Sequence, residues 1–361
     1  MPSSNAITVV DAASGLPPAL QRRLADARRF LREGSHAPGT RRKYAEDFAQ
    51  FGGWCERNGV NALPAEPGLL ALYIHALVDP DPTNPPRVRR AVGGPRGPEP
   101  SQRPMHPSSI TRVVAAIRYA HTQQGIDAPT SHPLVQEALR AARRTLGVAP
   151  HRRVQAAVVE VIRRLLLGLD DSLRHRRDRA LLTLGFAGAF RRAALVSLDI
   201  GDVVVVPEGL EVTLRRDKTD QTGVGRTLTI APGNTPTSCP VRATLAWIDS
   251  LALLGLRDGP LFRFIDRHGN VRPAHRRALS DRLGPQSVAL IVQRRARAVG
   301  LDATQFAGHS LRAGFVTSAV RAGKGVPKIM EQTGHRSANT VMAYVREADR
   351  WRDPASGGLG L

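Results

Sequence analysis

Apolar residues recur at helical spacing through the first 150 residues of the chain. Within residues 40–57, four apolar side chains lie three or four positions apart, as on one face of a helix: Tyr44, Phe48, Phe51 and Cys55. Similar patterns predict helices over 18–32, 65–77, 108–119 and 133–146. Because no strand pattern accompanies these helices, we expect an all-α domain over 18–146, interrupted by a Pro-, Gly- and Arg-rich loop over 79–107.

The pattern changes after the basic segment 147–153, which we interpret as a linker. Further helices are predicted over 158–169, 177–184, 240–254, 286–299, 310–322 and 340–346. A β-branched run at 202–206 and two short stretches, 210–215 and 226–230, around a Gly-bearing turn predict a small sheet with a hairpin. The second domain, 154–361, is therefore expected to be α+β, and the fold class is mainly α with a small β-sheet.

The charge of the chain indicates a polyanionic partner. Lys and Arg number 52 against 31 Asp and Glu, which gives a net charge of +21. Residues 1–150 carry 19 basic and 12 acidic residues and residues 151–361 carry 33 and 19, so both halves are positive. Nucleic acid is the leading candidate, because phosphate neutralisation gives affinity without sequence information. Aromatic residues make up only 4%, which argues against a platform that stacks single-stranded bases.

Several classes of protein are disfavoured by features that the sequence lacks. The two cysteines, Cys55 and Cys239, lie far apart, which excludes a disulfide scaffold and a Cys-rich zinc module and suits a reducing compartment. The longest apolar run, 180–190, is too short to span a bilayer, and no signal peptide is visible, so we expect a cytoplasmic protein. Metal-ligand spacing and a Gly-rich Walker loop are also missing, so no metal or other cofactor is expected.

Six residues of the second domain stand out by their order along the chain: Arg191, Lys218, His309, Arg312, His335 and Tyr344. The spacing of His309 and Arg312 places both on one face of a helix. Lys218 is the only lysine between Lys43 and Lys324, and Tyr344 is the only tyrosine of this domain. A lone His or Arg is more often structural than catalytic, so the joint order, not any single residue, carries the argument.

This order, with the local sequence around each residue, resembles the tyrosine site-specific recombinases, the family that includes Cre and the phage integrases. The resemblance is close over residues 158–351. The helical N-terminal part is similar to that family's SAM-like core-binding domain by layout only, and the short segment before Pro18 suggests the two-domain type. The resemblance implies a catalytic domain for DNA breaking and rejoining, which together with the N-terminal domain clamps double-stranded DNA. It also implies a homotetramer acting on specific sites in two duplexes.

The resemblance also assigns roles to the six residues. Tyr344 would attack phosphorus and form a 3′-phosphotyrosyl intermediate, with His309 as its proton acceptor. Arg191 and Arg312 would bind the nonbridging oxygens, with His335 as a third donor. Lys218 would protonate the leaving 5′-oxygen, because the pKa of an ammonium can be lowered while Arg stays charged. Neither metal nor ATP is needed, since one phosphate ester is exchanged for another.

Further DNA contacts and one departure from the family pattern complete these expectations. The expected phosphate contacts are Arg41, Arg42, Lys43, Arg112, Arg118, Arg152, Arg153 and Arg192. The family usually has an acidic residue three places after the first arginine, where this chain has Ala194. Ala194 favours one alternative, a basic DNA-binding protein that does not cleave. A second alternative, a type IB-like topoisomerase, stays open because it shares the chemistry.

Overall fold

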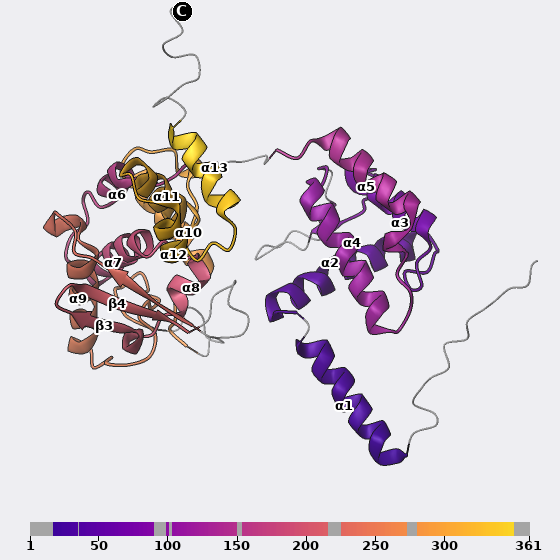
Figure 1. Ribbon diagram of the computed structural model, residues 1–361, viewed down its shortest axis with the longest axis horizontal. Coiled ribbons are helices and arrows are strands. Elements are labelled where there is room, and N and C mark those ends of the chain that lie inside the picture. The colour runs from indigo at the N-terminus through magenta and orange to yellow at the C-terminus, as the bar shows by residue number, and fades with distance from the viewer. Residues whose placement is uncertain are drawn as a thin grey trace, which may run out of the picture. The chain divides into compact units, whose positions relative to one another are not determined.

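The computed structural model describes residues 17–34, 36–89, 99–100, 103–149, 154–215, 225–272 and 280–349. The chain divides into two compact units, Met1–His151 and Arg152–Leu361 (Figure 1). Much of the predicted linker, from residue 150 to residue 153, lies outside the described residues. Among the described helices, none is long and apolar enough to cross a membrane.

The N-terminal unit contains five helices at the positions that the hydrophobic pattern predicts: α1 (Pro18–Gly34), α2 (Pro38–Arg57), α3 (Pro67–Val78), α4 (Pro107–Gln123) and α5 (Pro133–Leu146). Each helix begins at a proline, a residue whose fixed φ and missing N–H suit the first turn. Helix α2 packs on α4 and α3 packs on α5. A two-residue antiparallel pairing of β1 (Val88–Arg89) with β2 (Glu99–Pro100) lies in the segment expected to be a loop, and the pattern did not predict it.

The C-terminal unit contains a three-stranded antiparallel sheet, which packs against its helices with one face. The strands are β3 (Val203–Val206), β4 (Gly209–Leu214) and β5 (Arg226–Ile230), in the order β3-β4-β5, which confirms the predicted small sheet and hairpin. Leu210 pairs with Ile230 and Val212 with Leu228, and all four side chains are buried. The alternation of buried and exposed residues along β4 turns one face of the sheet toward the core.

Eight helices in the described part of the C-terminal unit accompany the sheet: α6 (Val159–Leu165), α7 (Leu173–Ala187), α8 (Arg192–Ser197), α9 (Pro240–Leu253), α10 (Pro285–Ala298), α11 (Ser310–Arg321), α12 (Val326–Thr333) and α13 (Ala338–Asp349). The pattern predicted six of them and missed the short α8 and α12. Helix α7 is the centre of the unit and contacts α6, α8, α9, α10 and α11. Its residues 180–185 are all buried, as expected for a helix with neighbours on most sides.

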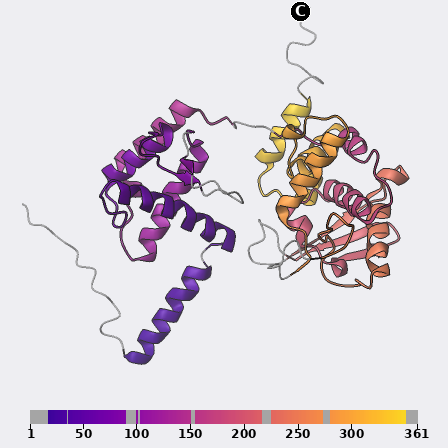
Figure 2. The same cartoon turned by 180° about the vertical axis from the view of Figure 1, so that it is seen from behind.

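The last two helices of the unit form a smaller core of their own with α11. Helix α13 packs on α11 and α12, as Figure 2 shows from behind, where α13 is yellow. Val316, Ile329 and Val341 are at most 1% exposed in this cluster, and the ring of Tyr344 packs against it. The packing of α13 therefore fixes the position of the only tyrosine in this unit.

Candidate active site

The turn between α7 and α8 positions Arg191. A Cβ at Gly188 would lie 2.0 Å from the Phe190 ring, so the turn requires glycine there. Ala189 follows with φ 48, in the left-handed region that non-glycine residues rarely adopt. Phe190 is then buried, and Arg191 takes an extended conformation at the N-cap of α8, where its side chain is half-buried.

The start of α11 brings His309 and Arg312 to the same turn. His309 precedes the first residue of α11, and Arg312 lies in its first turn. The Arg312 side chain is 2% exposed, and its Nη1 donates a hydrogen bond to the carbonyl oxygen of Ala189 at 2.8 Å. Ala189 lies two residues before Arg191, so this hydrogen bond links the segment of Arg312 to that of Arg191. The two bonded residues, Arg312 and Ala189, are 123 positions apart in the sequence.

The end of α12 and the following helix supply His335 and Tyr344. Helix α12 ends at Gly334, whose φ of 66 reverses the chain. Nδ1 of His335 lies 2.8 Å from the hydroxyl oxygen of Thr333. On α13, the hydroxyl of Tyr344 lies 3.5 Å from Nε2 of His309, at the outer limit of a hydrogen bond. Five of the six predicted site residues are thus brought close to one another from four separate segments.

The electrostatic field at this cluster is strongly positive. Desolvation, followed by the charges of Arg312 and Arg191, lowers the pKa of His335 to about 4. Partial desolvation and the same two arginines also lower the pKa of His309, with a smaller effect from Arg192. Both imidazoles are therefore neutral near pH 7, beside two guanidiniums. An anion entering the cluster would meet fixed positive charge and two neutral rings able to exchange protons.

The sixth residue, Lys218, lies outside the described residues. The residues on either side of that gap are firmly held. Arg215 forms ion pairs with Asp202 at 2.8 Å and with Asp199 at 3.1 Å. Arg226 donates from Nη1 to the carbonyl oxygen of Glu331 at 2.7 Å.

The sequence pattern did not predict two contacts in the turn that contains His335. The guanidinium of Arg226 lies against Gly334, where a Cβ would be 3.0 Å from Cζ, so Arg226 joins β5 to this turn. Thr333 contacts His335 directly. Two signals were available in the sequence. Arg226 begins the second strand of the predicted hairpin, and Thr333 lies two residues before His335.

The expected DNA contacts differ in their surroundings. Arg42, Lys43, Arg118 and Arg192 are exposed, Arg41 and Arg112 are half-buried, and Arg152 and Arg153 lie outside the described residues. Arg112 is paired through Nε with Asp47 at 2.7 Å, and Lys43 with Glu46 at 2.9 Å. Arg192 donates to Gln286 at 3.2 Å. The structure thus gives Arg112 a structural partner that the sequence did not indicate.

Two further observations bear on the chemistry of the cluster. Ala194 is 6% exposed and belongs to the main apolar core, so its methyl group packs where the family usually has a carboxylate. In the part of the chain that the structure describes, no group of three or more His, Cys, Asp or Glu side chains could hold a metal ion.

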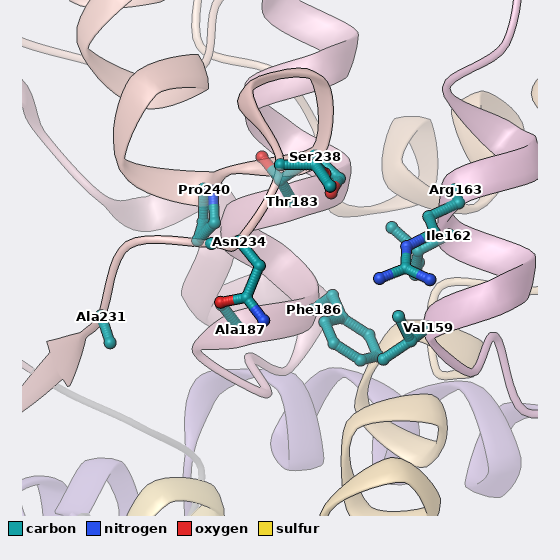
Figure 3. Close-up of a pocket in the computed structure, with 12 residues that line it drawn as sticks. Val159, Ile162, Arg163, Thr183, Phe186, Ala187, Ala231, Asn234, Ser238 and Pro240 are labelled. Atoms are coloured by element: carbon teal, nitrogen blue, oxygen red, sulfur yellow. The ribbon is translucent and has the colours of Figure 1, made fainter.

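An open pocket lies outside this cluster, between α6, α7 and the turn after β5 (Figure 3). Val159, Ile162 and Phe186 form much of its wall, and Arg163 is its only charged lining residue. None of the six predicted site residues lines it. The hydroxyl groups of Thr183, Thr235 and Ser238 line this pocket, but the described residues of its lining include no His, Asp or Glu that could accept a proton from them. The positive cluster is therefore the better candidate for the active site.

Comparison with known proteins gives a consistent result. The model of the Phage integrase family matches residues 155–350. An "Integrase/recombinase xerD homolog" from Selenomonas ruminantium is 33% identical over 328 residues, covering 90% of this chain and 86% of that protein. The recombinase Cre of Escherichia phage P1 is 23% identical over 308 residues, covering 82% and 80%. A lambda integrase dimer bound to a COC′ core site shares the fold, with a TM-score of 0.52 and 15% identity over 91% of this chain and 95% of that chain.

Proposed function

We propose, from the premise that the chain belongs to the phage integrase family and is a tyrosine recombinase, that it exchanges strands between two DNA duplexes through a covalent bond to Tyr344. The observation that carries the proposal is the convergence of Arg191, Arg312 and His335 beside Tyr344 and His309. This arrangement offers a nucleophile, a proton acceptor and positive charge in one place.

The nucleophilic step uses the Tyr344–His309 contact. A phenol is a weak nucleophile until its proton is removed, and Nε2 of His309 is the nitrogen nearest to the Tyr344 hydroxyl, at 3.5 Å. Burial, followed by the charges of the neighbouring arginines, lowers the pKa of His309, so its neutral ring has a lone pair that can accept that proton. The oxygen of Tyr344 then bonds to phosphorus, and the bond from phosphorus to the 5′-oxygen of the DNA breaks.

The arginines stabilise the charge that develops at phosphorus. Two guanidiniums can bind the nonbridging oxygens through bidentate hydrogen bonds and so neutralise the phosphodiester. Arg191 and Arg312 fill this role, and His335 adds a third hydrogen bond. Because these charges are already in place before the reaction, little reorganisation is needed in the transition state. Guanidiniums thus supply the positive charge for which other enzymes use a metal ion, and the exchange of esters needs no ATP.

Protonation of the leaving group is assigned to Lys218. The 5′-oxygen departs as a poor leaving group unless a proton reaches it, and an ammonium near guanidiniums can release one at neutral pH. This assignment rests on the place of Lys218 in the order of the six residues, because Lys218 lies outside the described residues.

The assembly and the DNA contacts belong to the same proposal. Strand exchange needs two duplexes, each cut in both strands, and therefore four copies of Tyr344, so we propose a homotetramer. The lambda integrase structure is a dimer bound to a core site, which favours the binding of paired copies to DNA. The exposed Arg42, Lys43, Arg118 and Arg192 are proposed to contact phosphates, and the cytoplasm, where DNA is accessible, is the proposed location.

A suicide substrate tests the proposal. The substrate is a duplex that carries the recombination site and a nick close to the cleavage position. After cleavage, the short fragment with the free 5′-hydroxyl dissociates, so it cannot attack the phosphotyrosine and the protein stays covalently attached to the DNA. The adduct is resolved on a denaturing gel. We expect an adduct from the parent protein and none from Tyr344→Phe, which loses one oxygen and little volume. Tyr119→Phe removes the same oxygen in the other unit and should still form the adduct.

Two results would contradict this reading. Adduct from Tyr344→Phe would place the nucleophile elsewhere, and full strand exchange by a complex with one copy per duplex would exclude the tetramer. Cleavage of any duplex regardless of sequence would instead match the topoisomerase alternative.

A further inference from the structure

Thr333 contacts a proposed catalytic residue, although nothing in the order of the six residues gives it a role. It is the last residue of α12 and is fully buried. Its hydroxyl oxygen lies 2.8 Å from Nδ1 of His335 and 2.7 Å from the carbonyl oxygen of Ile329. Both distances are those of well-formed hydrogen bonds.

The direction of the two hydrogen bonds follows from the chemistry of the groups. The carbonyl of Ile329 can only accept, so the single hydroxyl proton of Thr333 is donated to it. The hydroxyl oxygen is then the acceptor toward His335, and Nδ1 must carry the proton. Neutral His335 is therefore the Nδ1–H tautomer, with its lone pair at Nε2.

We propose that Thr333 is a positioning residue, which orients the imidazole of His335 and fixes its tautomer so that Nε2 is the nitrogen presented to the scissile phosphate. The inference rests on the proposed function for the role of His335, but the tautomer itself does not depend on catalysis. The neighbouring carbonyls of Glu331 and Gln332 are held by Arg226, so the end of α12 provides a fixed support for this contact.

The tautomer has a consequence for the reaction. Because neutral Nε2 carries no proton, it can donate to a nonbridging oxygen only after the ring takes up a proton from solvent. The imidazolium then donates from both nitrogens, to Thr333 and to the phosphate. Four groups from other elements act electrostatically on the ring: Arg312, Arg191, His309 and Arg226. They oppose protonation in the free protein, and an arriving phosphate anion offsets them.

Nitrogen NMR of the full-length protein, labelled with ¹⁵N-histidine and free of DNA, measures the tautomer directly near pH 7. The His335 signals are assigned by their loss in His335→Ala. His121 serves as an internal reference, because its Nδ1 donates to the Ile117 carbonyl at 2.8 Å and its Nε2 accepts from the Ala65 amide at 2.9 Å. We expect His335 to show the same Nδ1–H pattern as His121 in the parent protein and in Thr333→Ser, and to lose it in Thr333→Val.

The rate of adduct formation on the suicide substrate supplies the second measurement. Thr333→Val keeps the branched shape and removes the hydroxyl, so cleavage should slow roughly fivefold, the effect of losing one hydrogen bond. Thr333→Ser keeps the hydroxyl and should cleave at nearly the parent rate. An Nε2–H pattern in the parent protein, or parent-like cleavage by Thr333→Val, would overturn the inference. Parent-like cleavage by His335→Ala would instead overturn the proposed role of His335, leaving the tautomer result intact.

Discussion

A buried polar cluster of the N-terminal unit and the candidate site of the C-terminal unit are built in opposite ways. In the N-terminal unit, the buried side chains of Asp47 and His121 find their hydrogen-bond partners within the unit. Asp47 accepts hydrogen bonds from Nε and Nη2 of Arg112, and His121 uses both ring nitrogens on backbone groups of Ala65 and Ile117. Each donor meets an acceptor and the cation meets an anion, so these groups stabilise the fold and have little left to offer a ligand.

The candidate site in the C-terminal unit instead gathers groups that oppose one another. Arg191 and Arg312 both lower the pKa of His309 and His335. Positive charges placed close together make protonation of the rings costly and become favourable only when an anion arrives. In this molecule, compensated charges hold a structural cluster together, whereas charges of one sign gather at the site that we propose to bind a phosphate.

The largest effect should come from removing the positive charge of the site. We expect Arg191→Ala and Arg312→Ala each to slow adduct formation by roughly 10²-fold or more, as when a preorganised transition-state donor is lost. Arg112→Ala removes an arginine from the compensated cluster and should leave the cleavage rate of the folded protein unchanged. Thermal melting controls for misfolding, which matters most for the buried Arg312. Equal losses from Arg112→Ala and Arg191→Ala would remove the distinction between the two regions.

The next largest effect should be on the stability of the fold, when the ion pair between Arg112 and Asp47 is removed. Arg112→Ala leaves the carboxylate of Asp47, only 8% exposed, without this partner and should lower the free energy of unfolding by about 2 kcal/mol. Urea unfolding checks the value.

The same variant should not change the salt dependence of DNA binding. Arg118→Ala, at an exposed position, should instead reduce the slope of log binding constant against log salt concentration by about 0.9 if Arg118 contacts a phosphate. A reduced slope for Arg112→Ala with unchanged stability would reverse this assignment.

A smaller effect should appear in the pH dependence of stability. The pKa of His335 is about 4 in the folded protein, against about 6.5 in an unfolded chain. Between these values the unfolded state binds more protons, so the free energy of unfolding decreases as the pH falls from 6.5 to 4. For this half-buried ring we expect a loss of about 1–2 kcal/mol, and the pKa of His309 is shifted in the same direction.

Urea unfolding at a series of pH values, without DNA, measures this loss. His335→Asn should make the curve flatter between pH 6.5 and 4, while its stability near pH 7 provides the baseline. Identical curves for the two proteins would show that His335 is not held neutral by its surroundings.

The smallest effect concerns the backbone that supports the site. In the N-terminal unit the described positive-φ positions are glycines, Gly59, Gly125 and Gly147, whereas the site uses Ala189 at φ 48. Ala189→Gly relieves this strain and should raise the free energy of unfolding by about 0.5–1 kcal/mol. The carbonyl that accepts from Arg312 is kept, so cleavage should continue. A decrease in stability on urea unfolding would mean that the loss of the buried Ala189 methyl group and the greater freedom of glycine in the unfolded chain outweigh the relief of strain.

The sequence by itself determined much of this molecule. Periodic apolar positions predicted the five N-terminal helices and six of the described C-terminal ones, because burying one face of a helix is a local property of the chain. The β-branched run at 202–206 and the two stretches of the hairpin predicted the sheet in the same way. The chemistry was suggested by the order of six residues: Arg191, Lys218, His309, Arg312, His335 and Tyr344. Each of these features can be read without knowing what lies opposite in space.

Tertiary structure decided the rest. The helices α8 and α12 span six and eight residues, too short to be stable alone, so packing against neighbours determines that they form. The hydrogen bond from Arg312 to Ala189 and that from Arg226 to Glu331 join residues more than 100 positions apart. No local pattern encodes such contacts, because their free energy arises only when the folded chain brings distant groups together.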